Sequence, residues 1–71
     1  MRSGDTLEYK GITYTLTDDP VINCVDYTMD ADAVDEEGED CLITWPLFDD
    51  WYRHESRNTM CDWADIKRIE Y

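Results

Sequence analysis

The sequence predicts a mainly β domain, a small antiparallel sheet or partly closed barrel of about five strands. Apolar and polar residues alternate in two runs, and each run is interrupted by a turn that contains glycine. Three Trp, five Tyr and one Phe supply an aromatic core that a disordered acidic chain would lack. We therefore interpret residues 1–71 as a single small acidic domain, near the lower size limit for independent folding. A homodimer is one way for so short a chain to bury more apolar surface.

Residues 6–17 predict the first β-hairpin. Both flanks alternate and are rich in residues that favour strands, and Lys10-Gly11 fits a two-residue turn. This register gives the apolar cross-strand pairs Tyr9 with Ile12 and Leu7 with Tyr14. All four side chains then share one face, which is what fixes the register of a hairpin.

Residues 25–48 predict the second hairpin, after a break at Asp18-Asp19-Pro20. Alternation runs from Val25 to Ala33, and a three-residue loop, 36–38, places Gly38 at the left-handed position of a bulged turn. The resulting pairs are Ala33 with Cys41, Ala31 with Ile43, Met29 with Trp45 and Tyr27 with Leu47. We expect the sheet to curve around a core of Leu7, Tyr9, Tyr14, Tyr27, Met29, Ile43 and Trp45.

The segment after the second hairpin is ambiguous in the sequence. Apolar residues at helical spacing favour a short helix around 47–57, and an irregular loop held by aromatic residues fits equally well. Asn58-Thr59 indicates a break. We expect a turn at 62–65 and a closing strand at 66–71.

The charge of the chain is extreme and segregated. It has 18 Asp and Glu against 6 Lys and Arg, a net charge of −12, and no basic residue lies between Lys10 and Arg53. Such a charge opposes binding to nucleic acid or to an anionic membrane and favours a basic protein as partner. Neither a membrane-spanning apolar run nor a signal peptide is present in the sequence, so we expect a cytoplasmic location.

The predicted partner-binding surface is this acidic stretch. Alternate residues of a strand share a face roughly 6.6 Å apart, which aligns Asp26, Asp30 and Asp32 in one row, and the hairpin loop adds further acids. The full candidate set is Asp18, Asp19, Asp26, Asp30, Asp32, Asp35, Glu36, Glu37, Glu39 and Asp40. A merely solvated surface usually mixes charges of both signs. The pattern therefore indicates a decoy for a nucleic-acid-binding groove, a non-enzymatic inhibitor of another protein.

Two other interpretations compete with the decoy. In the first, the aromatic segment 45–52 anchors a structural or assembly adaptor, with Trp51 as the contact and the charge serving solubility. In the second, the acids adapt a housekeeping protein to high salt, as the excess of Asp over Glu suggests. The high-salt interpretation predicts acids along the whole chain, whereas the ends are nearly balanced in charge.

The patterns for metal binding and catalysis are weak. The run Asp30-x-Asp32-x-x-Asp35 resembles the start of a calcium loop but lacks Gly at the sixth position. Four candidate zinc ligands exist, without Cys-x-x-Cys spacing. They are Cys24, Cys41, Cys61 and His54. We therefore predict no metal, cofactor or catalytic site, and no enzyme activity.

In size, acidity and β content the chain resembles small phage-encoded anti-defence proteins. Some of these, among the anti-restriction and anti-CRISPR proteins, act as nucleic-acid mimics. The resemblance covers composition only and matches no motif, so it carries no residue role to this sequence. It implies an inhibitor that would act in the cytoplasm of an infected host cell.

Overall fold

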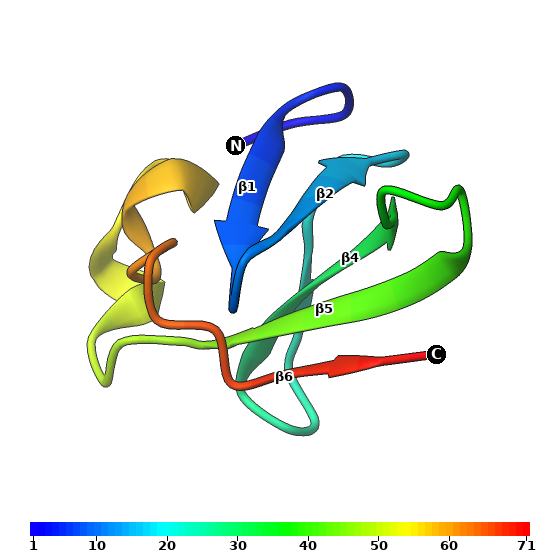
Figure 1. The fold of residues 1–71 in the computed structure, drawn as a ribbon. Helices are drawn as coiled ribbons and strands as arrows, with labels where there is room; N and C mark the ends of the chain where they lie inside the picture. The colour runs from blue at the N-terminus through cyan, green and yellow to red at the C-terminus, as the bar shows by residue number, and fades with distance from the viewer.

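The computed structural model describes residues 1–71 and contains one antiparallel sheet of six strands that does not close into a barrel (Figure 1). The strands are β1 (Thr6–Tyr9), β2 (Ile12–Leu16), β3 (Val21–Asn23), β4 (Thr28–Val34), β5 (Asp40–Pro46) and β6 (Arg68–Glu70). The order across the sheet is β1-β2-β4-β5-β6, and β3 also pairs with β4. The predicted fold class is confirmed.

The first hairpin forms as the sequence predicts. Tyr9 pairs with Ile12 and Leu7 pairs with Tyr14. Lys10 and Gly11 both have positive φ angles, 52° and 82°, which suits a two-residue turn whose twist matches the strands.

The hairpin of β4 and β5 has the predicted bulged turn. Gly38 has a φ of 81°, and the Asp35 N–H donates to the Glu39 carbonyl at 3.0 Å, which closes a loop of three residues. The predicted pairs Met29 with Trp45, Ala31 with Ile43 and Ala33 with Cys41 are all confirmed.

The start of this hairpin was predicted wrongly. Residues 24–27 form a turn instead of a strand, and the three residues before it, Val21–Asn23, form β3, which the sequence analysis missed. Tyr27 has a φ of 56° and is 64% exposed, so it lies outside the core although its carbonyl still accepts the Leu47 N–H at 3.2 Å. Alternation alone could not reveal this, because a turn with two exposed apolar residues has the same pattern as a strand.

β2 and β3 together form one interrupted strand along β4. β2 pairs with the C-terminal end of β4, at Ala33 and Val34, and β3 pairs with its N-terminal end. The Thr17 N–H continues the pairing by donating to the Asp32 carbonyl at 2.9 Å. The chain then leaves β4 over residues 18–20 and pairs with it again as β3. The predicted break at 18–20 is therefore a detour, and it places Asp18 and Asp19 near Asp32.

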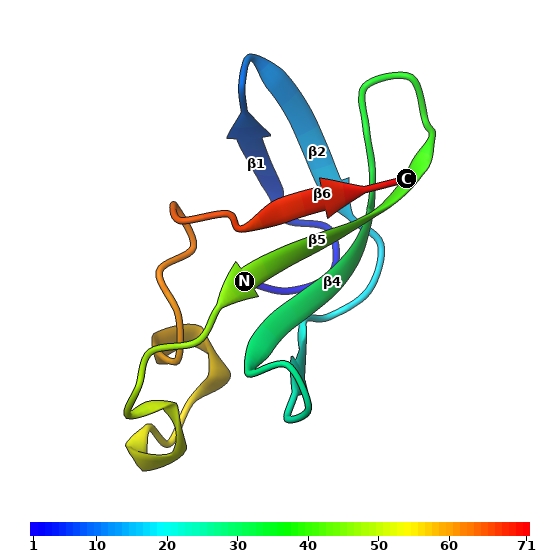
Figure 2. The ribbon, with the colours of Figure 1, turned by 90° about the horizontal axis from the view of Figure 1, so that it is seen from below.

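Of the two predicted alternatives for the segment 47–61, a short helix or an irregular loop, the structure has the irregular loop. It contains two 3₁₀ turns, η1 (Trp51–Arg53) and η2 (Arg57–Thr59), and Leu47 forms an isolated bridge with Cys61. Both turns lie at one end of the sheet, and the loop between β4 and β5 lies at the other end with the C-terminus (Figures 1 and 2). The predicted turn at 62–65 is present, and the closing strand is shorter than predicted.

The core lies on the inner face of the curved sheet and under the loop. Met29, Ile43 and Trp45 are fully buried, and Met60 and Cys61 from the loop join them. The rings of Trp45 and Trp63 meet edge to face at 4.8 Å. Leu7 and Tyr9 are half-buried against this core, so six of the seven predicted core residues contribute to it and Tyr27 does not.

Candidate partner-binding surface

The outer face of β4 carries the row of acids that the alternation predicts. Met29, Ala31 and Ala33 are buried on the inner face, so the intervening Asp30 and Asp32 lie on the other side of the strand. Asp32 is exposed and Asp30 is half-buried. Since β4 has partners on both edges, this face is held by the best-supported strand of the sheet.

Acids from three segments meet around Asp32. One shallow depression of about 310 Å³ is lined by Asp18, Asp19, Asp30 and Asp32 together with apolar residues. A second depression of about 330 Å³ is lined by Asp18, Asp32 and Asp40. Neither lining contains a cationic residue. We call these five residues, Asp18, Asp19, Asp30, Asp32 and Asp40, the acidic face.

The carboxylates of the acidic face differ in what they bind within the protein. Asp30 accepts hydrogen bonds from Thr28 Oγ1 at 2.8 Å and Asn23 Nδ2 at 3.3 Å, and Asp19 accepts one from the Ser3 N–H at 2.8 Å. The remaining three carboxylates accept no hydrogen bond from the chain, although they line the same depressions. These three, Asp18, Asp32 and Asp40, are therefore free to bind a donor from outside.

Two acids of the hairpin loop have a role in the fold that the sequence analysis did not identify. Asp35 accepts hydrogen bonds from the N–H groups of Glu39 and Glu37, at 3.0 and 2.9 Å, and from the Tyr71 hydroxyl at 2.9 Å. The Glu39 N–H and then the Tyr71 hydroxyl hold the pKa of Asp35 below its usual value. Glu36 accepts the Thr13 N–H at 2.8 Å, beyond the last pair between β2 and β4.

The other predicted contact residues lie at both ends of β4. Glu37 and Glu39 are exposed on the hairpin loop, and Asp26 lies in the turn at the opposite end, where it accepts a hydrogen bond from Asn23 Nδ2 at 3.2 Å. Trp51 is half-buried against the core, while its neighbour Tyr52 is 65% exposed. The structure thus brings five of the ten predicted acids together in the acidic face, places the other five at the two ends of β4 and gives Trp51 a packing role.

Three of the six basic residues gather away from the acidic face. Lys10, Lys67 and Arg68 line a cleft of about 390 Å³ between the β1–β2 hairpin and β6, together with Tyr9 and other apolar residues. Arg68 also forms an ion pair with Glu70. These three cations lie away from the acidic face, whereas Arg57 donates a hydrogen bond to the Pro20 carbonyl, next to the segment that carries Asp18 and Asp19.

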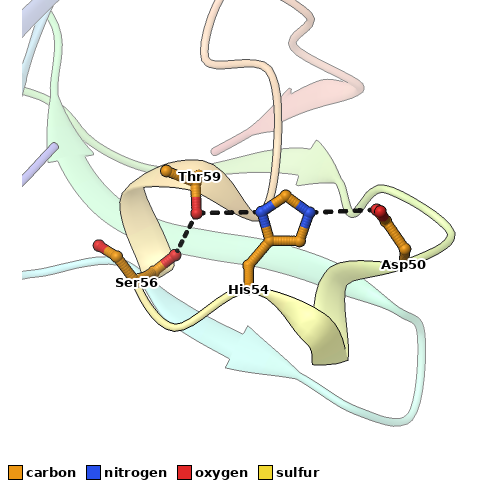
Figure 3. Close-up of polar contacts among 4 residues, drawn as sticks. All are labelled: Asp50, His54, Ser56 and Thr59. Atoms are coloured by element: carbon orange, nitrogen blue, oxygen red, sulfur yellow. Dashed lines mark hydrogen bonds and ion pairs between the residues drawn. The ribbon is translucent and has the colours of Figure 1, made fainter.

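The His54 side chain bridges the two 3₁₀ turns (Figure 3). Its Nε2 lies 3.1 Å from Asp50 Oδ1, and its Nδ1 lies 3.0 Å from Thr59 Oγ1. This order of Asp, His and hydroxyl resembles the arrangement that activates a nucleophile. However, the Thr59 hydroxyl donates to the Ser56 carbonyl at 2.9 Å, so its proton is not directed at His54. The contacts therefore fit a brace between the two turns.

The cysteines do not form a ligand set. Cys24 is exposed, whereas Cys41 and Cys61 are buried in the core. Burial raises the pKa of the Cys41 thiol and raises that of Cys61 to about 11. No group of three or more His, Cys, Asp or Glu side chains is arranged to hold a metal ion.

The helical turns of this chain are too short to cross a bilayer, and no helix qualifies as a membrane span. Comparison with protein-family models, with curated proteins and with solved structures gives no match.

Proposed function

We propose that this protein is a non-enzymatic inhibitor that occupies a basic, nucleic-acid-binding surface of another protein. In this proposal it acts in the cytoplasm as a decoy of the phage anti-defence type. The acidic face is the contact surface, and the partner supplies the Lys and Arg side chains that the nucleic acid would otherwise contact. The observation that carries the proposal is the convergence of five carboxylates, from three segments, on depressions without any cationic lining residue.

The spacing of these charges supports a decoy. Acids two residues apart on β4 are separated by roughly 6.6 Å, and a paired strand such as β5 lies about 4.8 Å away. One DNA strand presents a charge about every 3.4 Å along the helix axis. A single row of acids is sparser than that, and the detour at 18–20 and Asp40 on β5 add charges on both sides of Asp32. Together they give a patch instead of a line.

The availability of the carboxylates also supports this function. Asp35 and Glu36 are engaged within the hairpin loop, but Asp18, Asp32 and Asp40 have no internal donor. A carboxylate that is exposed and unbonded keeps its full hydrogen-bonding capacity for Arg, whose planar fork binds carboxylates at two points. Binding should therefore be steered by charge and weaken as salt increases.

The experiment is a competition measured after the partner has been isolated with the tagged protein from a lysate of the cells in which it acts. Labelled duplex DNA bound to that partner should be displaced by this protein, with an apparent affinity that falls steeply with salt. The double variant Asp18→Lys/Asp32→Lys should lose the competition. Asp30 is left unchanged because its hydrogen bonds to Thr28 and Asn23 support the fold.

A matched control is the double variant Glu8→Lys/Asp65→Lys. It makes the same change in net charge at two exposed side chains outside the acidic face. We expect it to compete nearly as well as the unmodified protein. Simultaneous binding of DNA and this protein to the partner, or equal losses in both double variants, would exclude the decoy.

The adaptor remains a second candidate because of the loop around η1. Phe48 and Tyr52 are 43% and 65% exposed there, so they replace Trp51 as the aromatic contacts of such an adaptor. In that case Tyr52→Ser would abolish partner capture and Asp18→Lys/Asp32→Lys would not.

A further inference from the structure

The turn between β3 and β4 exposes two apolar side chains, Val25 and Tyr27, although neither is needed to form the turn. Val25 is 87% exposed and Tyr27 is 64% exposed. The φ of Tyr27 is 56°, in the left-handed region, where a bulky residue is uncommon and Gly or Asn is favoured. The turn would therefore form more easily with Asn at position 27. Packing does not account for the tyrosine, since most of its side chain lies in solvent.

The turn is held by hydrogen bonds of the Asn23 side chain, which also joins it to the acidic face. Asn23 Oδ1 accepts the N–H groups of Val25 and Asp26, at 3.0 and 3.2 Å. The amide of the same side chain donates to Asp26 at 3.2 Å and to Asp30 at 3.3 Å. One side chain thus fixes the turn and connects it to β4. A contact that is already ordered before binding loses less conformational entropy when a partner arrives.

We infer that Val25 and Tyr27 form an apolar anchor that inserts into an apolar pocket bordered by Lys and Arg on the partner protein. This inference rests on the proposed function and specifies the chemistry of the partner. The acidic face supplies long-range attraction, and the anchor supplies the desolvated contact. Tyrosine suits this role, because it buries a large area while fixing few rotatable bonds.

The negative charge beside the anchor favours a pocket with a basic rim over a second copy of this chain or an anionic membrane. Asp26 lies between the two anchor residues in the chain, and Asp30 is connected to it through Asn23. A second copy would bring the same negative charges to the contact, and an anionic membrane would repel them as well. A pocket with a basic rim satisfies both the apolar side chains and the carboxylates beside them.

The anchor is tested with substitutions chosen for the left-handed backbone conformation of Tyr27. Tyr27→Asn removes the aromatic ring and places a residue that tolerates a positive φ, so the thermal midpoint should hold or rise. The matched control is Lys10→Asn, because Lys10 is the only other non-glycine residue with a positive φ, at 52°. It makes the same type of change in the turn of the first hairpin, away from β3. Val25→Ser provides a second anchor variant at a residue of ordinary φ.

Two synthetic peptides serve as probes. One is an amphipathic peptide of Lys, Arg and Leu, and the other is the same peptide with every Leu replaced by Ser. Both carry the same charge, so the difference between their affinities reports the apolar contact alone. Fluorescence anisotropy at physiological salt measures each affinity for the unmodified protein and the three variants.

We expect the Leu peptide to bind at least about tenfold more tightly than the Ser peptide, in the range of a single interface anchor. Tyr27→Asn and Val25→Ser should reduce that advantage and leave the Ser peptide unchanged, and Lys10→Asn should preserve it. Equal affinities of the two peptides for the unmodified protein would overturn the inference. So would an unfolded Tyr27→Asn variant, or sedimentation that shows self-association through Tyr27.

Different results of these measurements would exclude the proposed decoy function and the apolar anchor. Binding of the Ser peptide depends on charge alone, so its loss with salt and with Asp18→Lys/Asp32→Lys reports the acidic face. If that dependence holds while Tyr27→Asn has no effect, the anchor is excluded and the decoy stands.

Discussion

The Tyr71 hydroxyl donates a hydrogen bond to Asp35 Oδ2 at 2.9 Å, which connects the end of the chain after β6 to the loop between β4 and β5. The two residues lie 36 positions apart, one directly after β4 and the other directly after β6, the two strands that flank β5. The neighbouring Tyr14 hydroxyl and the hydrogen bond to Asp35 raise the pKa of Tyr71. The same contact helps to hold the Asp35 carboxylate in its charged form.

Replacement of Tyr71 by Phe should loosen the hairpin loop without disturbing the core. The variant loses the donor to Asp35 but keeps the ring, so we expect a small decrease in the thermal midpoint. Amide hydrogen exchange should accelerate at Glu37 and Glu39, whose N–H groups share the Asp35 carboxylate. Unchanged exchange at both amides would show that the Tyr71 contact does not order the loop.

The stability should depend on pH through Asp35. The pKa of Asp35 is lowered in the folded protein, mainly by the Glu39 N–H, so its contribution is complete above the unfolded value of about 3.8 and is lost as the pH falls through the folded value. Protonation of the other acids relieves repulsion over the same range, so the comparison must be with Asp35→Asn. The difference in thermal midpoint between the two proteins should shrink below pH 3.8. A constant difference across that range would contradict the assignment.

Substitution of Gly38 separates backbone strain from crowding. Its φ is 81°, and a Cβ built there meets nothing within 4 Å, so any cost of a side chain comes from the backbone. Gly38→Ala should lower the free energy of unfolding by about 1 kcal/mol, and Gly38→Asn should lower it less, because Asn tolerates the left-handed region. Urea unfolding measures both. Equal losses for Ala and Asn would show that strain in the left-handed backbone conformation is not the cause of the loss.

Thiol reactivity should distinguish the three cysteines. Cys24 is exposed, whereas Cys41 and Cys61 are buried and have raised pKa values, so at neutral pH both buried residues remain as inert thiols. A disulfide reagent should modify one cysteine rapidly in the native protein and three in denaturant. The variant Cys24→Ser should abolish the rapid phase, and a rapid phase that survives would place a second thiol at the surface.

The sequence predicts the two hairpins because glycine and apolar pairing act locally there. Lys10-Gly11 and Gly38 specify turns whose registers leave only apolar pairs, and both registers are confirmed. β3 could not be predicted in this way, because its three residues have no alternating pattern of their own and form a strand only through their pairing with β4. The same limit applies to Asp35 and Glu36, which appear in the sequence as two more acids of a run. Their role depends on Tyr71 and Thr13, which only the fold brings near.

The interrupted strand formed by β2 and β3 has a consequence for how the chain folds. Three pairs of neighbouring strands, β1–β2, β3–β4 and β4–β5, are joined by short turns, β2 and β4 are separated by residues 17–27 with β3 among them, and β5 and β6 are separated by the two 3₁₀ turns. Most strand pairing therefore requires closure of small loops only, a topology that favours rapid folding for a β protein. We expect the pairing of β2, β3 and β5 with β4 to bring the carboxylates around Asp32 together. Their repulsion should make the folding rate, and not only the final stability, increase with salt.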